Sequence, residues 1–287
     1  MLAVTAAWGA CFVVIRWGLR DSPVLWFAAL RALVAGAVLL PFSSRGPRIP
    51  KGWRVWLLVF ALSLTNVTLA FGAMFAGVAG LATGTAAVLA NAQPLLILLP
   101  AWWFYGERVR ARGALALVAG FGGLILTTVS GGGGRGAALS LLAAGGITAG
   151  TLLVRQVKGA DVLGVAAWHF LIGGVLLAAL AGVVEGAPGI NWTPRFVGVV
   201  LFLGVIGTAG TFVIWFQEVL RSPLAAVTAW TFLVPVFGIG FGAWLLRERP
   251  SGWSALGLGL VLGSLWIAQR APVVRCRRDE GSEAGSE

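Results

Sequence analysis

Acidic residues are scarce in this sequence. Asp and Glu together number 10 in 287 residues, and all charged residues make up only 11% of the chain. Soluble domains carry about a quarter charged residues, whereas here 59% of residues are apolar and the mean hydropathy is +0.92. A soluble fold could not cover that much apolar surface, so the expected class is an integral membrane protein.

Histidine and cysteine are almost missing, since the chain has 1 His and 2 Cys. Cys11 and Cys276 stand far apart, so neither a disulfide framework nor a metal site is expected. The sequence also lacks an HExxH motif, a GxSxG motif and paired Asp residues within apolar segments, so an enzyme is not expected. The glycine-rich stretch 130–136 has no following Lys-Ser/Thr pair, so no nucleotide or other cofactor is expected.

Long apolar runs organise the chain, and each is about 20 residues long, the length that a helix needs to cross a hydrocarbon core of about 30 Å. All ten acidic residues lie outside these runs, and of the Lys and Arg residues only Arg16 and Arg31 lie inside one. The ten predicted membrane helices are approximately 1–19, 23–42, 55–75, 81–105, 113–130, 136–154, 162–184, 196–216, 224–246 and 252–268.

The net charge of +11 comes from residues at the ends of these runs, so it does not indicate nucleic-acid binding. Most of the basic residues fall on one side of the membrane if the N-terminus is cytoplasmic. The positive-inside rule therefore favours two cytoplasmic termini. Residues 271–287 are polar, and we expect them to form a disordered cytoplasmic tail.

An internal duplication divides the chain. The segment that begins at Pro94 aligns without gaps on the segment that begins at Pro235, with matched Trp, Glu-Arg and Gly residues. The predicted units are 1–129 and 137–270, joined by a glycine-rich linker over 130–136. Five crossings in each unit would insert the second unit upside down, and inverted repeats are the usual basis of alternating access around a site near the membrane midplane.

Polar and aromatic side chains at membrane depth are the candidates for that site. Asn66, Asn91 and Gln93 carry amides, and Thr208, Thr211 and Trp215 follow a spacing that puts them on one helix face. The alternative for each is a hydrogen bond or a close helix contact without a ligand. Pro94 and Pro235 are the candidate hinges, since each removes a helical hydrogen bond. The full set of cavity candidates is Trp8, Asn66, Asn91, Gln93, Thr208, Thr211, Trp215, Trp230 and Thr231.

Two ionisable side chains also lie inside the predicted helices. An arginine near mid-span, as Arg31 is, costs about 2.5–3.5 kcal/mol on insertion scales. It must therefore pair with backbone carbonyls, reach the interface, or meet an anionic substrate or lipid. His169 is the only side chain in a span that could change charge near neutral pH, so it is the candidate for proton coupling, with a packing role as the alternative.

Several motifs resemble a known family. The opening WGACFVVIRWGL, the pair Leu30-Arg31, the run NAQPLLILLPAWWFYGER and its partner FLVPVFGIGFGAWLLRER resemble the two EamA-type domains of the bacterial drug/metabolite transporter superfamily. The resemblance implies an all-α, ten-helix exporter of amino acids or other metabolites in the bacterial cytoplasmic membrane. It implies a cavity built mainly from the first, third, fourth, sixth, eighth and ninth helices. The second copy reads LLRERP where the family commonly has a glycine before the glutamate.

Two other functions fit the same composition, namely a passive pore or facilitator and a membrane assembly protein without transport activity. Saturable flux with counter-transport would distinguish a carrier from a pore. Beyond a small solute and the lipid bilayer, the GxxxG spacings Gly146/Gly150 and Gly259/Gly263 leave a homodimer open as an alternative to internal packing.

The topology gives a first prediction. Reporter tags fused to the two ends should both report a cytoplasmic location, because two units of five helices return the chain to its starting side. Paired alkaline phosphatase and green fluorescent protein fusions at each end measure this. Ends on opposite sides of the membrane would contradict two five-helix units.

Overall fold

The computed structural model describes most of the chain, and within the described residues all regular structure is helical. These residues are 1–45, 52–97, 100, 115, 118–120, 122–123, 125–126, 134–157, 161–222, 227, 230–231, 233–249 and 252–270. The predicted tail 271–287 and the first copy of the Glu-Arg pair, Glu107-Arg108, lie outside them.

Five stretches of the described chain are long and apolar enough to cross a membrane. They are Val24–Phe42, which contains α2 (Val24–Leu39) and the start of η1 (Leu40–Arg45); Trp53–Gly80, made of α3 (Trp53–Leu62), η2 (Ser63–Leu69) and α4 (Ala70–Gly80); α9 (Arg135–Val154); α10 (Val162–Val184); and Pro194–Arg221, made of α11 (Pro194–Leu201), η3 (Phe202–Gly210) and α12 (Thr211–Arg221).

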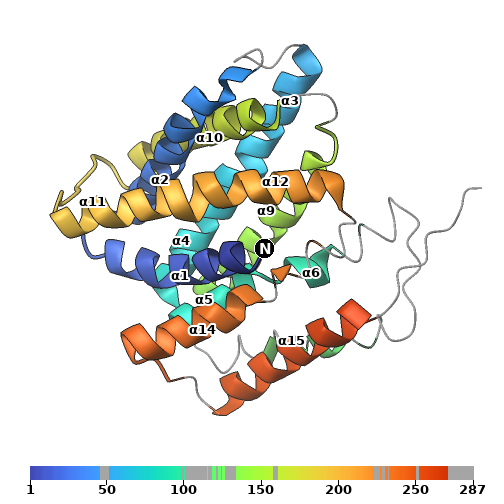
Figure 1. Ribbon diagram of the computed structural model, residues 1–287. Coiled ribbons are helices and arrows are strands. Elements are labelled where there is room, and N and C mark those ends of the chain that lie inside the picture. Colours follow the sequence, from blue (N-terminus) through green and yellow to red (C-terminus); the bar gives the residue numbers. More distant parts are fainter. Residues whose placement is uncertain are drawn as a thin grey trace, which may run out of the picture.

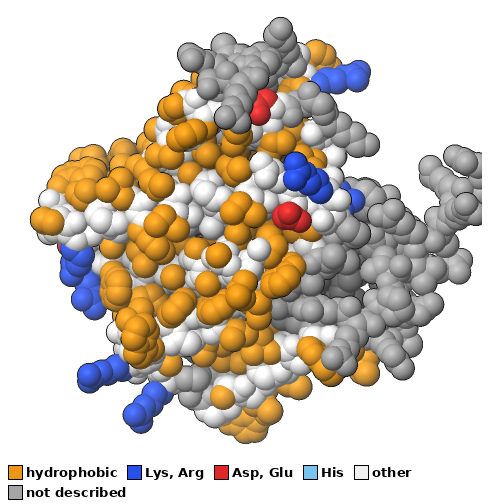
Figure 2. Space-filling view, viewed as in Figure 1, with side chains coloured by type: hydrophobic (Ala, Val, Ile, Leu, Met, Phe, Trp, Pro, Cys, Tyr) orange, Lys and Arg blue, Asp and Glu red, His pale blue; other side chains and the backbone are white. Residues whose placement is uncertain are grey.

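The remaining helices are shorter. They are α1 (Leu2–Gly18), α5 (Thr83–Ala90), α6 (Gln93–Leu96), α14 (Leu233–Leu246) and α15 (Gly252–Arg270). Figure 2 shows apolar side chains over much of the described surface, with arginines at its margins, and large apolar residues such as Val183 and Trp244 are exposed. The protein is therefore an all-helical membrane protein, as the composition predicts.

Several helices begin where the sequence supplies a partner for their free N–H groups. The Asp161 carboxylate accepts from the backbone N–H groups of Leu163 and Gly164, both at 3.1 Å, at the start of α10. The Thr193 hydroxyl accepts from Phe196 N–H at 3.1 Å at the start of α11. Such caps satisfy donors that have no partner within the helix.

Helices from the two halves of the chain pack against each other. The closest pairs are α2 with α10, α4 with α9, and α1 with α14, which lie side by side in Figure 1. Glycines allow these approaches. A Cβ at Gly146 would lie 2.7 Å from the Thr65 carbonyl oxygen, and one at Gly150 would lie 2.8 Å from the Asn66 Cγ. The Gly146/Gly150 pair thus packs inside the bundle, whereas Gly259 and Gly263 on α15 have no described atom in reach.

The third predicted helix of each half contains a π-helical segment, and each of these two spans is 28 residues long. Leu69 ends η2 and Gly210 ends η3. These two residues are separated by the same number of positions as Pro94 and Pro235, so the repeat seen in the sequence extends upstream into the structure. π-Helical turns are rare and are frequently found at functional sites.

Polar links join the halves at one end of the bundle, which we call the Glu185 end, and three of these links are made by carboxylates. Arg195 Nη2 donates to the Asp21 carboxylate at 2.7 Å. The Glu185 carboxylate accepts from Leu25 N–H at 2.9 Å and also from Trp26 N–H. The third link is made by the Glu248 carboxylate, which accepts from Thr83 N–H at 3.0 Å and from Gly84 N–H at 3.3 Å. Two of the three links therefore cap the N-termini of α2 and α5 with carboxylates from the other half.

These links also fix the directions of the helices. α1 and α4 end at the Glu185 end, where Arg16 Nη1 donates to the Val78 carbonyl at 2.7 Å. α9 begins there, because a Cβ at Gly136 would lie 3.0 Å from Leu81 Cγ. The first helix of one half thus ends where the first helix of the other begins.

Three sequence expectations are corrected. The predicted span 81–105 is interrupted, because α5 ends at Ala90 and α6 begins at Gln93, with Asn91 in a non-helical conformation (φ −102°, ψ 23°). Pro94 therefore stands in the first turn of α6, and Pro235 in the first turn of α14, where the missing N–H breaks no helical bond. The predicted linker 130–136 ends early, because Arg135 and Gly136 already belong to α9.

The contact between α1 and α14 gives a prediction about stability. A Cβ at Gly9 would lie 2.5 Å from Phe237 Cβ and 3.0 Å from the Val234 carbonyl oxygen. Gly9→Ala should therefore lower the stability of the solubilised protein by about 1–3 kcal/mol, because the helices must move apart. Gly240→Ala on α14 is the matched control, since its Cβ would meet no described atom within 4 Å. Thermal unfolding in detergent measures both, and equal melting temperatures would contradict close packing at Gly9.

Candidate functional site

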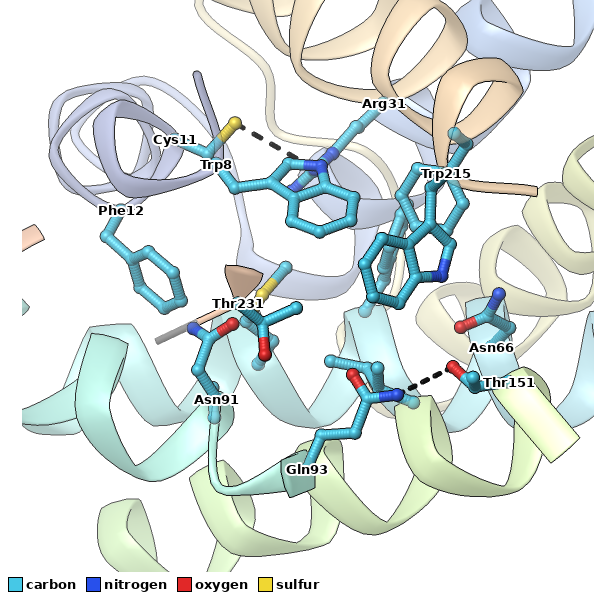
Figure 3. Close-up of a pocket in the computed structure, with 15 residues that line it drawn as sticks. Trp8, Cys11, Phe12, Arg31, Asn66, Asn91, Gln93, Thr151, Trp215 and Thr231 are labelled. Atoms are coloured by element: carbon cyan, nitrogen blue, oxygen red, sulfur yellow. Dashed lines mark hydrogen bonds between the residues drawn. The ribbon is translucent and has the colours of Figure 1, made fainter. Parts of the chain in front are cut away.

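A cavity lies where helices of the two halves meet, and Figure 3 shows the side chains around it. Its lining comes from the six helices that the family resemblance implies and also from α2, through Arg31. Its volume is about 60 Å³, which holds a few water molecules. The lining residues are Trp8, Cys11, Phe12, Arg31, Asn66, Phe71, Met74, Ala90, Asn91, Gln93, Ile147, Thr151, Phe212, Trp215 and Thr231.

Equivalent positions of the two copies line this cavity. Three pairs of lining residues are separated by the same number of positions as Pro94 and Pro235. These pairs are Phe71/Phe212, Met74/Trp215 and Ala90/Thr231. The cavity therefore lies between corresponding surfaces of the repeats.

The break between α5 and α6 brings two amides to the cavity. Gln93 Nε2 donates to Thr151 Oγ1 on α9 at 2.8 Å, and Asn91 Nδ2 donates to the Ala87 carbonyl at 2.8 Å. Both amides donate through nitrogen, so their oxygens remain as acceptors. Asn66 lines the cavity from η2 and is 3% exposed. Amides and hydroxyls thus make up much of the uncharged polar part of the lining.

Aromatic rings form another part of the wall. Trp8 packs edge-on against Phe212 and Trp215, with ring centroids 5.7 and 5.2 Å apart. Its indole N–H donates to Thr211 Oγ1 at 2.9 Å, which fixes the plane of the ring. Thr211 therefore holds Trp8 in place from behind the wall and does not line the cavity.

Arg31 is the only charged residue in the described lining, and it is 2% exposed. Its Nε donates to Thr208 Oγ1 at 2.7 Å, and its Nη2 donates to the Gly207 carbonyl at 3.2 Å. The guanidinium carbon also lies 4.4 Å from the centroid of the Phe71 ring, a cation–π distance. The sequence left several partners open for Arg31. In the structure its guanidinium pairs with a backbone carbonyl, and also with a hydroxyl and an aromatic ring.

Three candidates from the sequence, Trp230, His169 and Pro235, do not line the cavity. Trp230 is 43% exposed, because it precedes Thr231 by one residue and neighbouring helical positions face different sides. His169 is fully buried in α10, outside the lining, with its ring 5.5 Å from that of Phe216 and Nδ1 at 3.1 Å from the Val165 carbonyl oxygen. Pro235 is buried at the start of α14 and lines no part of the cavity.

Some lining residues were not among the sequence candidates. Phe71, Phe212 and Met74 are apolar residues in apolar helices, so neither composition nor periodicity distinguishes them. The repeat could have found them, because extending the alignment upstream from Pro94 and Pro235 pairs Phe71 with Phe212.

A second, larger hollow lies between α4, α9 and α10 and has a volume of about 570 Å³. Apolar residues such as Leu139, Leu142 and Leu180 make up most of its lining, and the last two are 46% and 41% exposed. Exposed apolar side chains in a membrane protein face hydrocarbon. This hollow therefore suits lipid chains better than a polar solute.

A polar, aromatic-lined cavity between two related halves of a helical membrane protein is typical of a polytopic membrane transporter. The comparison of sequences agrees. The model of the EamA-like transporter family matches residues 1–129 and 134–269. The chain belongs to this family, which is a family of transporters and not of enzymes.

Individual relatives and a solved structure extend the comparison. The chain is 26% identical to an uncharacterised transporter of Synechocystis sp., over 93% of this chain and 88% of the relative. It is also 26% identical to a probable amino-acid metabolite efflux pump of Escherichia coli, over 93% and 92%. A crystal structure of another protein shares the fold, with a TM-score of 0.71 at 20% identity over 93% of this chain and 94% of that one.

The anchoring of Arg31 gives a prediction. Thr208→Val removes the hydroxyl that accepts from Arg31 Nε and should lower the stability by about 1–3 kcal/mol, because it leaves a buried charged donor unpaired. Thr208→Ser keeps the hydroxyl and is the matched control. Thermal unfolding of both solubilised variants measures the difference. A Val variant as stable as the Ser variant would show that this bond contributes nothing.

Proposed function

We propose that the protein is a secondary transporter that exports small organic metabolites, such as amino acids or related compounds, across the bacterial cytoplasmic membrane by alternating access. The observation that carries this proposal is the cavity lined by corresponding residues of the two copies, Phe71 with Phe212 and Met74 with Trp215. A site between related halves can be presented to either face by motion of one half against the other.

The proposal includes ten membrane helices arranged as two inverted units, 1–129 and 137–270, with a short linker between them and a cytoplasmic tail over 271–287. The helix directions support it. α1 ends at the Glu185 end whereas α9 begins there, and α2 begins at that end whereas α10 ends there. Corresponding helices of the two units therefore run in opposite directions. On this topology, with both termini cytoplasmic, the Glu185 end faces the outside.

The described state then has its outer side closed. The three links at the Glu185 end each join one half to the other, so opening this side requires them to break. The cavity of about 60 Å³ is also well below the 300–1,000 Å³ that is typical of small-molecule sites. The helices must separate before a metabolite can bind, as alternating access requires.

The substrate class rests on the lining and on the relatives. The side chains that we propose to contact the solute are Trp8, Asn66, Asn91, Gln93, Trp215 and Thr231, which combine rings with amides and a hydroxyl. Thr208 and Thr211 do not line the cavity but accept hydrogen bonds from Arg31 and Trp8, respectively, which do. The Escherichia coli relative is named a probable amino-acid metabolite efflux pump, which favours amino-acid-like solutes. Proton coupling through His169 stays a prediction, and its position outside the cavity favours packing.

A passive facilitator and an assembly protein without transport activity are the competing functions. Counterflow distinguishes them: a carrier loaded with unlabelled solute accelerates the entry of labelled solute, whereas a pore does not. An assembly protein shows no saturable flux of any solute. Reconstituted vesicles and a panel of labelled amino acids, with and without a pH gradient, provide the assay.

Two variants test the cavity. Trp8→Ala and Asn91→Ala should each lower the rate of counterflow about tenfold or more without lowering membrane abundance. The first removes an aromatic ring from the cavity lining, and the second removes an amide that we propose to contact the solute. Trp230→Ala is the matched control, since this ring is 43% exposed and outside the cavity. Loss of abundance together with flux would assign Trp8 and Asn91 to folding, and unchanged flux would remove the cavity from the transport path.

A further inference from the structure

The guanidinium of Arg31 is not fully paired. Nε donates to Thr208, and Nη2 donates to the Gly207 carbonyl and contacts Cys11 Sγ, but Nη1 is buried and has no hydrogen-bond partner among the described residues. A buried charged donor without a partner is costly, and Arg31 lines the cavity. A residue that lines the cavity therefore carries an unused cationic donor.

No carboxylate in the described part of the chain neutralises this charge. The salt bridge found among the described residues, Asp21 with Arg195, is at the Glu185 end. The other described lining groups are amides, hydroxyls, a thiol and apolar side chains. Arg31 therefore gives the described cavity a net positive charge in surroundings of low dielectric constant, where charge interactions are strong.

We propose that Arg31 binds the carboxylate of the transported solute through Nη1, so that the substrates are small carboxylates or amino acids with an apolar body. The proposal rests on the transport function proposed above and specifies its substrate class. A guanidinium suits a carboxylate because charged N–H donors form short, strong bonds to carboxylate oxygens. The apolar body lies against the rings of Trp8, Phe212 and Trp215.

The same site accommodates a zwitterion. The amides of Asn91 and Gln93 donate through nitrogen to the protein, so their oxygens can accept from an ammonium group. Figure 3 shows these two side chains reaching the cavity from below, while Arg31 lies beside Cys11 and Trp8 on the opposite side. A solute that carries both a carboxylate and an amine matches this distribution, whereas an organic cation without a carboxylate is repelled by Arg31.

A matched ligand series on the unaltered protein tests the charge requirement. The probes are L-phenylalanine, 3-phenylpropanoate, 3-phenylpropanamide and 2-phenylethylamine, which share the ring and differ in charge. Binding is measured by calorimetry on the full chain in lipid nanodiscs, and transport by competition in counterflow. The two carboxylates should bind about tenfold or more tightly than the amide and the amine. Equal affinity across the series overturns the proposal.

Variants of Arg31 then assign the effect to this residue. Arg31→Gln should remove the preference for carboxylates, and Arg31→Lys should keep part of it because the charge remains. Arg221→Gln, at the exposed end of α12, is the control and should bind like the unaltered protein. A carboxylate preference that survives in Arg31→Gln overturns the assignment. If all four probes are exchanged without a preference for charge, the carboxylate site at Arg31 is contradicted but the transport function is not. If no solute of the wider panel is exchanged, the proposed transport function is contradicted as well.

Discussion

The buried guanidinium of Arg31 is the constraint on which the centre of the bundle depends. A charge at membrane depth is tolerated only where polar groups face it, and here these groups come from η3, through the Gly207 carbonyl and Thr208 Oγ1. Cys11 Sγ on α1 lies 4.0 Å from Nη2, and the Phe71 ring on α4 covers the guanidinium. One side chain thus holds α1, α2, α4 and η3 in contact around the cavity, so a carrier cycle must preserve this cluster or replace its bonds.

The two π-helical segments explain how apolar helices supply these polar groups. A π turn widens the helix and alters which backbone groups are paired. Thr208 and Thr68 illustrate the wider spacing, because each hydroxyl donates to a carbonyl five residues earlier, at Leu203 and Ser63. Asn66 in η2 and Gly207 in η3 occupy the same position of the repeat. The first presents a side-chain amide to the cavity and the second a carbonyl to Arg31, so the copies have kept the same distortion and use it for different partners.

The sequence predicts the architecture well and the site only in part. The lengths of the apolar runs and the positions of the charges predict a helical membrane protein, because every span in a membrane must satisfy its backbone hydrogen bonds internally. The site depends instead on helix rotation, which is poorly determined where all faces are apolar. Trp230, which was expected in the cavity, is exposed and outside the lining for this reason. The break at Asn91 was missed because hydropathy continues through it, although Pro94 marked the region. Asn66, Asn91, Gln93 and Arg31 line the cavity, and the sequence marks them because a polar group at membrane depth needs a partner wherever it lies.

The distribution of acidic residues bears on how easily the protein changes state. Within the described chain, Glu185 and Glu248 lie at the Glu185 end, half-buried, and accept from N–H groups at the starts of α2 and α5. At a membrane surface, water can replace these bonds, so breaking each costs about 1 kcal/mol rather than the several kcal/mol of a bond in hydrocarbon. The closed and open states can therefore be close in free energy. In the proposed alternating access, binding of the solute can then shift the balance between them, because a ligand favours the state that it binds more tightly.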